Sequence, residues 1–164
     1  MKKGKRRRKL TVVVLLLCMI LGSLHVSAAD ELLGTVVDGS LLTEETEVST
    51  TVYPKARWTY LSDGTGSMAV TGTRTVRLSG STTAKKSVDA IYVNMYLQRL
   101  VNGTWCTYYI GTRSTKYDAY YASITETGLS VEGGYYYRAA GAHVINENGT
   151  IESISSYTDG IWFD

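Results

Sequence analysis

The sequence is poor in the residues from which small extracellular proteins build cross-links and metal centres. Among its 164 residues there are only two cysteines, two histidines and one proline. A structural zinc site needs four ligands, mostly Cys and His, and a disulfide needs a pair of cysteines. Both depend on whether Cys18 and His25 stay with the rest of the chain. The N-terminal sequence predicts that they do not.

The first 29 residues have the layout of a secretory signal peptide. Residues 1–9 contain seven basic residues, an apolar run covers 10–21, and the small residues Ser27, Ala28 and Ala29 come after it. We expect cleavage after Ala28 or Ala29 and a secreted, extracellular product. The alternative is a retained membrane anchor, but this apolar run is shorter than the roughly 20 residues that cross a bilayer. No membrane contact is expected after cleavage.

Removal of residues 1–29 changes what the remaining chain can do. Cys106 and His143 become the only cysteine and histidine, which excludes an intramolecular disulfide and a four-ligand zinc site. All seven basic residues of the head are lost, so ten basic residues remain against 15 acidic ones, and the net charge becomes −5. Nucleic acids and anionic membranes are bound through basic patches. Neither is an expected partner.

Few side chains are available for catalysis or metal binding. Cys106 and His143 are the only candidates for a Cys-His nucleophile pair, so a Cys-His hydrolase is a remote alternative. A packed thiol is the more common role for a lone cysteine. The Asp-Gly pairs at 63–64 and 159–160 are typical of Asx turns rather than calcium loops. We therefore expect no catalytic residue, no metal, no cofactor and no enzymatic activity.

Residues 30–56 differ in composition from residues 57–164. They carry six acidic residues and no basic residue before Lys55. Apolar doublets at 32–33, 36–37 and 41–42 recur at near-helical spacing, but Gly34 and Gly39 interrupt them. This pattern predicts an acidic flexible leader over 30–56. A short helix that docks on the domain or on a partner is the alternative.

Residues 57–164 have the composition of a β-domain, rich in Thr, Val, Tyr, Ser and Gly. Tyr, Val and Thr favour strands, and short alternating runs between Gly, Asn and Asp turns are typical of a sandwich or barrel. We predict an all-β, immunoglobulin- or fibronectin-III-like β-sandwich of about seven antiparallel strands. The predicted strands cover 67–71, 75–82, 88–101, 104–113, 117–125, 134–145 and 150–157.

Asn102-Gly103 is the strongest local turn signal in the chain. Asn-Gly supplies the two positive-φ residues of a type I′ hairpin turn. A two-residue loop would place Leu100 opposite Trp105, Leu97 opposite Tyr108, Tyr96 opposite Tyr109 and Met95 opposite Ile110. In this register Met95 and Leu97 face the core, and the alternate residues of the strand face outward.

A second local signal, which indicates a tyrosine corner, lies between Leu129 and Tyr135. Leu129 lies six residues before Tyr135, which resembles the tyrosine corner of fibronectin type III domains, where the Tyr hydroxyl bonds nearby backbone. The pattern predicts that Tyr135 is the corner residue and that Tyr137 points inward. Tyr136 and Arg138 would then point outward. The resemblance covers one corner and implies a sandwich, with no activity attached.

Thirteen tyrosines and three tryptophans are the chain's most distinctive feature. Aromatic rings with polar tips stack on sugars and are enriched at interfaces. We predict a non-enzymatic binding module for a cell-wall or host glycan or a protein partner. Its exposed stripe would consist of Tyr92, Tyr96, Trp105, Tyr109, Tyr136 and Arg138.

Two other roles for the same tyrosines stay open. Cross-strand pairing alone would stabilise the sheet by roughly 0.2–1 kcal/mol per pair. A structural, self-assembling extracellular protein would use the same exposed rings to contact its own copies. The sequence favours neither a monomer nor an oligomer.

Two segments carry a resemblance to a known family. They are the stretch from Tyr96 to Trp105 (YLQRLVNGTW) and Gly134-Tyr-Tyr-Tyr-Arg138. Together with the signal peptide and acidic leader, they resemble an uncharacterised family of small secreted proteins of Gram-positive gut-type bacteria. The resemblance covers roughly residues 58–160. This family has no assigned activity, so it implies no functional residue.

Overall fold

The computed structural model describes residues 32–164, and every regular element in that part of the chain is a β-strand. No helix there is long and apolar enough to cross a membrane. The predicted signal peptide and its cleavage site lie outside the described residues. The strands are β1 (Val36–Val37), β2 (Ser40–Thr43), β3 (Glu47–Val52), β4 (Leu61–Gly72), β5 (Thr75–Val101), β6 (Thr104–Ile110), β7 (Ser114–Ser130), β8 (Tyr135–Glu147), β9 (Thr150–Tyr157) and β10 (Gly160–Phe163).

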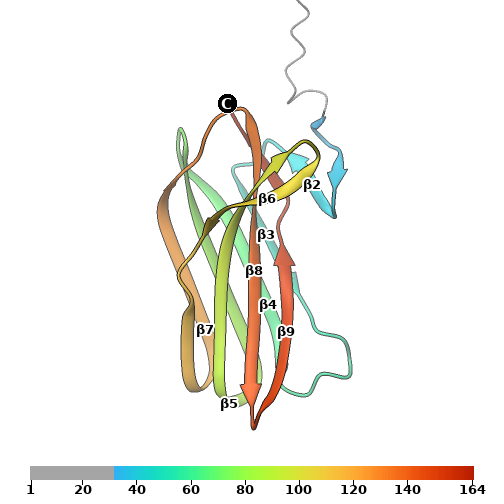
Figure 1. Cartoon of the computed structure of the whole chain (residues 1–164), viewed down its shortest axis with the longest axis vertical. Helices are drawn as coiled ribbons and strands as arrows, with labels where there is room; N and C mark the ends of the chain where they lie inside the picture. Colours follow the sequence, from blue (N-terminus) through green and yellow to red (C-terminus); the bar gives the residue numbers. More distant parts are fainter. Residues whose placement is uncertain (1–31) are drawn as a thin grey trace, which may run out of the picture. The chain divides into compact units, whose positions relative to one another are not determined.

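The strands form one curled sheet, because β5 is long and bends in its middle (Figure 1). The first half of β5 pairs with β4 on one side and with the end of β7 on the other. Its second half pairs with the start of β7, with β6 and with β8. The pairing with β7 shifts between Thr83 and Val88, around the exposed residues 85–87. The two halves of β5 thereby face each other across the core.

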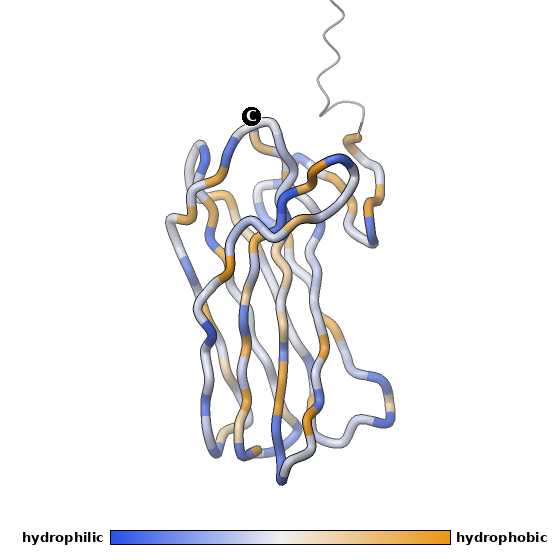
Figure 2. Tube along the Cα trace, viewed as in Figure 1, coloured by the Kyte–Doolittle hydropathy of each residue, from blue (hydrophilic) through white to orange (hydrophobic). Residues whose placement is uncertain are grey.

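Apolar and polar residues alternate along the strands (Figure 2). The alternate apolar residues share one side of each strand, and the buried ones form the core on the concave side of the sheet. Along β5, Val76 and Leu78 of the first half and Ile91 and Val93 of the second half are fully buried. Met95 reaches across the core from the second half toward Gly80 of the first. A Cβ atom on Gly80 would collide with the Met95 sulfur. Glycine at position 80 is therefore required by the close approach of the two layers.

The all-β class is confirmed, and the number and arrangement of strands differ from the prediction. Ten strands form a single curled sheet, instead of about seven in a sandwich. The predicted strands 75–82 and 88–101 are two parts of β5. The prediction missed β10, which is only four residues long, and the three N-terminal strands.

Strands β1, β2 and β3 lie within residues 36–52, which the sequence assigns to a flexible leader. Strand β3 pairs antiparallel with β4 over six residues. Strand β2 pairs parallel with β10, with Leu42 next to Gly160. Leu42 and Val48 are buried. The segment whose acidic composition suggested a leader therefore contributes three strands to the sheet.

The Asn-Gly hairpin between β5 and β6 forms as predicted at its turn. Asn102 and Gly103 have φ values of 50° and 76°, and Leu100 lies opposite Trp105. Farther from the turn the predicted register is wrong. The pairing shifts by one residue beyond Gln98, so Leu97 lies opposite Tyr109, and Tyr96 lies opposite Ile110. The inserted residue allows both Tyr108 and Tyr109 to pack against the core.

The tyrosine that closes the β7–β8 corner is Tyr137, and the prediction of Tyr135 is wrong. The Tyr137 hydroxyl donates to the Glu132 carbonyl (3.1 Å) and accepts from the Glu132 amide (3.0 Å). Its ring is fully buried and makes edge-on contacts with Tyr108 and Phe163. Tyr135, at the start of β8, stays half-buried. The corner hydroxyl thus comes from a residue two positions inside the strand.

Candidate functional site

The six aromatic and basic residues predicted as a binding stripe do not form one exposed surface. Tyr92 and Tyr96 lie half-buried on the side of β5 that faces away from the core. The Arg113 guanidinium lies over the Tyr92 ring, 4.5 Å from its centre. Tyr109 packs against the core instead. Tyr92, Tyr96 and Trp105 are therefore only partly exposed on the predicted face, and Tyr109 lies on the other side of the sheet.

Arg138 was predicted to point outward, but it is 2% exposed. Its guanidinium lies between the rings of Trp105 and Tyr157, 4.5 Å from each. It donates to the Ser40 hydroxyl (2.8 Å) and to the Asp38 carbonyl (3.2 Å). Burial lowers the pKa of Arg138, whereas the Asp38 carboxylate raises it. Arg138 thus fastens the β1–β2 hairpin to the sheet.

Tyr136 and Trp105 belong to the same buried junction. Tyr136 is 2% exposed, so its predicted outward orientation is also wrong. It packs with Leu42 and Leu100, and its ring contacts Trp162. The Trp105 indole donates to the Val37 carbonyl (3.0 Å). These residues hold strand β2 in place, which explains why a sequence interpretation without β2 expected them at the surface.

The structure does not bring Cys106 and His143 together. Cys106 lies opposite Arg99, and His143 lies opposite Val93, six residues away on β5. Six strand residues span roughly 20 Å. Cys106 is exposed rather than packed as predicted, and its thiol contacts only the Thr104 carbonyl, at 3.8 Å. In residues 32–164, no group of three or more His, Cys, Asp or Glu side chains is placed to hold a metal ion.

His143 lies in the core within a chain of hydroxyl hydrogen bonds. The Thr82 hydroxyl donates to the Tyr92 carbonyl (3.0 Å), so its oxygen accepts a hydrogen bond from His143 Nδ1–H (3.0 Å). His143 Nε2 then accepts from the Ser156 hydroxyl (2.8 Å). Burial lowers the pKa of His143 to about 4, although Ser81 and Asp63 act in the opposite direction. The ring is neutral and fully buried, which makes it a structural group.

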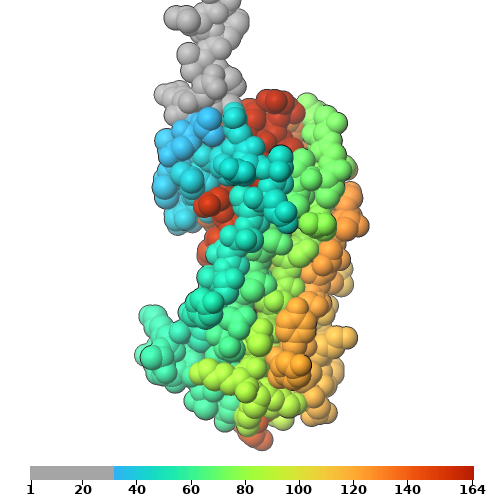
Figure 3. All heavy atoms as spheres, turned by 180° about the vertical axis from the view of Figure 1, so that it is seen from behind, coloured from blue at the N-terminus to red at the C-terminus, as the bar shows by residue number. Residues whose placement is uncertain are grey.

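A groove of about 380 Å³ lies on the convex side of the sheet, over β3, β4, the first half of β5 and the middle of β7. Figure 3 shows this side of the molecule, where these strands lie next to one another. We call it the hydroxyl groove. It is lined by Ser49, Thr50, Thr51, Thr65, Gly66, Ser67, Ser79, Gly80, Ser81, Tyr121, Ser123, Ile124 and Thr125.

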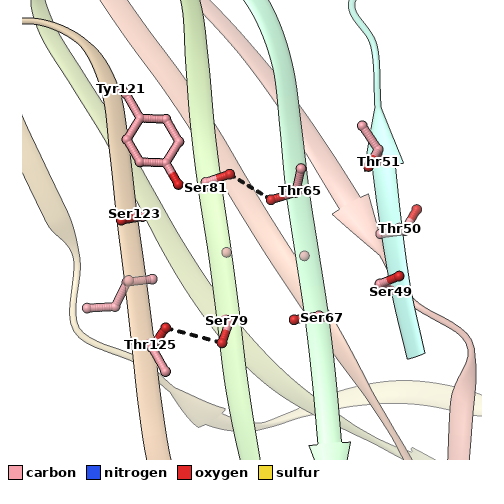
Figure 4. Close-up of a pocket in the computed structure, with 13 residues that line it drawn as sticks. Ser49, Thr50, Thr51, Thr65, Ser67, Ser79, Ser81, Tyr121, Ser123 and Thr125 are labelled. Atoms are coloured by element: carbon pink, nitrogen blue, oxygen red, sulfur yellow. Dashed lines mark hydrogen bonds between the residues drawn. The ribbon is translucent and has the colours of Figure 1, made fainter. Parts of the chain in front are cut away.

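Strand register arranges the hydroxyls of the groove in two rows that cross all four strands (Figure 4). The first hydroxyl row consists of Thr51, Thr65, Ser81 and Ser123. The second hydroxyl row consists of Ser49, Ser67, Ser79 and Thr125. Strands are spaced by about 4.8 Å, so each row is about 14 Å long. The two rows lie two residues apart along each strand, or about 6.7 Å.

The hydroxyls use only part of their hydrogen-bonding capacity within the protein. Thr65 Oγ1 and Ser81 Oγ are 2.7 Å apart, and Thr125 Oγ1 donates to Ser79 Oγ at 3.2 Å. Each hydroxyl has one donor and two acceptor positions. Thr51 and Ser123, at the ends of the first row, are exposed. The groove therefore presents many donors and acceptors to whatever lies in it.

The floor of the groove is flat because glycines lie between the two hydroxyl rows. Gly66 pairs with Gly80, and Thr50 and Ile124 continue this glycine row on the outer strands. Odd-numbered residues of these strands point outward here, so the glycine row turns its other side to the core. There Met95 lies behind Gly80, and Ser156 and the end of Met95 lie behind Gly66, where side chains would otherwise be. Core packing thereby leaves a smooth strip of backbone between the rows.

Tyr121 provides the aromatic ring of the groove. It lies at the β7 end, beside the first hydroxyl row, and its side chain is 47% exposed. In Figure 4 its hydroxyl points toward Ser81 and Ser123. None of the 13 lining residues carries a charge. On the groove side of the sheet, the next charges along the strands are the Glu47–Arg77 ion pair beyond the second row and Asp63 beyond the first, whereas Glu126 points to the other side.

The sequence interpretation missed the hydroxyl groove, although a signal for it exists. Ser and Thr recur at every second position in 49–51, 65–67, 79–83 and 123–125. Period-two hydroxyls on neighbouring strands must share one face of the sheet. The aromatic content of the chain pointed to Tyr92 and Tyr96 instead.

These features define an all-β protein with an uncharged, hydroxyl-lined groove on one face of a curled sheet. The chain belongs to the family of unknown function DUF6147, whose model matches residues 28–160. This confirms membership of an uncharacterised family, as the resemblance implied. No curated protein matches the chain. The family match starts ahead of β1 and ends at the first residue of β10, so it covers β1 to β9 completely.

Proposed function

We propose that the protein is a secreted, non-enzymatic binding module whose ligand lies in the hydroxyl groove. The observation that supports this proposal most directly is the pair of hydroxyl rows across four strands, with the exposed Tyr121 ring at one end. Regular secondary structure fixes the positions of these side chains before a ligand arrives. A preorganised surface of this kind loses little conformational entropy on binding.

Export of this module is supported by the N-terminal sequence. The basic head, the apolar run and Ala28-Ala29 predict a cleaved signal peptide, and the family match starts at residue 28. The family resemblance implies a Gram-positive origin. An exported domain of such a cell would meet the cell wall first. Cell-wall and host glycans are therefore the ligands to test before protein partners.

The test compares a substitution inside the groove with one outside it. Ser67→Arg fills the centre of the groove, and Ser153→Arg places the same side chain on the exposed outer side of β9. We expect residues 30–164 to bind a cell-wall preparation or a glycan array. Ser67→Arg should reduce binding at least tenfold, and Ser153→Arg should leave it unchanged. Absence of binding, or equal effects of both substitutions, would contradict the proposed function.

A self-assembling structural role is the second candidate, and β7 favours it. This 17-residue strand pairs only with β5 among the described strands, and it exposes Tyr117 and Tyr120. Positive φ values at Asp118 and Gly128 bend the strand, and such irregularities limit edge-to-edge pairing. Light scattering across a concentration series decides between the roles. A monomer at high concentration would exclude self-assembly.

A further inference from the structure

The absence of charge among the 13 lining residues limits what the hydroxyl groove can hold. Nucleic acids bind through Lys and Arg contacts to phosphates, and the lining has neither. Protein interfaces rely on buried aromatic and Arg anchors, whereas the floor here is glycine backbone. A ligand that matches Ser and Thr must itself donate and accept at closely spaced positions. Polyhydroxylated sugars have this chemistry.

The direction of the rows sets the direction of the ligand. Both hydroxyl rows run across the strands from β3 to β7, and the glycine row lies between them. A chain lying on the glycine row would have hydroxyl partners on both sides along about 14 Å. A ligand aligned with the strands would cross the groove in a much shorter distance. The geometry therefore favours an extended chain of several sugar units.

Tyr121 lies at one end of the glycine row, and charged residues lie beyond the two hydroxyl rows on its sides. The half-exposed ring of Tyr121 is available to stack on a sugar at the β7 end. Asp63 lies beyond the first hydroxyl row, and the Glu47–Arg77 ion pair lies beyond the second. A side branch or an acidic group on the ligand would meet these residues. A linear, uncharged chain avoids both.

We propose that the ligand is a neutral, unbranched glycan that lies across the strands from β3 to β7 on the glycine row. This inference rests on the proposed function, because it assigns a ligand class and an orientation to the same groove. The glycan contacts hydroxyls of both rows, and its terminal ring stacks on Tyr121.

The first test is a length series measured by calorimetry with residues 30–164. The probes are cello-, chito- and malto-oligosaccharides of one to six units, with oligogalacturonates as the anionic control. For the series that fits, we expect affinity to increase until the chain spans the groove and then to level off. Anionic oligomers of equal length should bind at least tenfold more weakly. Length-independent affinity or preference for the anionic series would overturn the inference.

The second test probes both ends of the first hydroxyl row. Thr51→Val on β3 and Ser123→Ala on β7 each remove one hydroxyl, and Thr150→Val is the matched control on exposed β9. For the hexasaccharide we expect each end variant to raise Kd by about three- to tenfold, the range for one lost hydrogen bond. For the disaccharide, only one end should matter. Equal losses for both lengths would contradict a ligand that spans the groove.

The aromatic contact has its own control on the same strand. Tyr121→Ala should weaken hexasaccharide binding more than tenfold, as for an anchor residue at an interface. Tyr117→Ala removes a more exposed ring outside the groove and should have no effect. If Tyr117→Ala weakens binding as much as Tyr121→Ala does, the inferred orientation is wrong.

The outcomes separate this inference from the proposed function. If no oligosaccharide binds, but Ser67→Arg abolishes binding to a cell-wall preparation, the glycan inference fails and the groove remains the binding site. If Ser67→Arg has no effect on any ligand, both fail. Circular dichroism of each variant shows whether it is folded.

Discussion

Lowering the pH from 7 to 5 should destabilise the protein through one buried residue, His143. The ring is neutral in the folded state, because burial lowers its pKa from 6.5 to about 4. In the unfolded chain the same ring is protonated below about pH 6.5. The unfolded state therefore binds one more proton between these values. Stability should fall as the pH decreases through this range and stop falling, for this group, below about pH 4.

The magnitude depends on the size of the pKa shift. A shift of one pKa unit corresponds to about 1.4 kcal/mol, so the whole shift of His143 corresponds to about 3 kcal/mol. Between pH 7 and 5 the expected loss is about 2 kcal/mol, because the unfolded ring is only partly protonated near pH 6.5. This is a large fraction of the roughly 5–15 kcal/mol that is typical of a domain.

Urea unfolding followed by tryptophan fluorescence measures this dependence directly. His143 is the only histidine in residues 30–164, so no other histidine titrates in the same range. His143→Gln retains a donor and an acceptor for Thr82 and Ser156. This variant should be less stable at pH 7 but should show a flat profile from pH 7 to 5. A native profile that is already flat, or an equal slope in the variant, would refute the assignment of a buried neutral ring.

The remaining predictions concern the packing that supports the groove and the N-terminal strands. The Glu152 carboxylate accepts from the amides of Thr59, Tyr60 and Leu61 at 2.7–3.0 Å, and these bonds lower its pKa against the effect of burial. Glu152→Gln should cost about 2–3 kcal/mol in urea unfolding, and the stabilisation that Glu152 provides should be lost as the pH falls below about 4.5. Gly80→Ala should lower the free energy of unfolding by about 1–3 kcal/mol, because the added methyl group collides with Met95. Met95→Ala removes this collision, so it should destabilise the Gly80→Ala variant less than it destabilises the native protein. Arg138→Met should increase hydrogen exchange in residues 36–43 while β8 stays protected, because Arg138 bonds the β1–β2 hairpin to the sheet. If residues 36–43 stay as protected as in the native protein, this role of Arg138 is wrong.

Local signals predicted the strands and the turn, whereas features that depend on distant partners could not be predicted. Asn102-Gly103 forms its turn because positive φ values are a property of the dipeptide itself. The register shift beyond Gln98 depends on where Tyr108 and Tyr109 find space in the core. The continuity of β5 was similarly hidden, because the polar residues 85–87 at its bend have the composition of a loop.

The predicted exposure of Tyr136 and Arg138 was wrong because it depends on the assignment of residues 30–56. Treating 30–56 as a leader removed β2 from the sheet, and β2 is what buries Tyr136 and Arg138. It also removed β3, which provides Ser49 and Thr51 to the hydroxyl groove. The alternation of apolar Val48 with polar Ser49 indicates a strand, but the acidic residues next to it are typical of a flexible segment. Period-two hydroxyls, compared across all candidate strands, would have indicated the groove.

The most direct test of the central claim is an NMR titration of residues 30–164 with neutral cello-, chito- and malto-hexasaccharides. If the hydroxyl groove is the binding site, the amide signals that shift should belong to residues 49–51, 65–67, 79–81 and 121–125. Shifts confined to the opposite face, around Tyr92, Tyr96 and Trp105, would contradict the account and would return the binding site to the aromatic face predicted from the sequence.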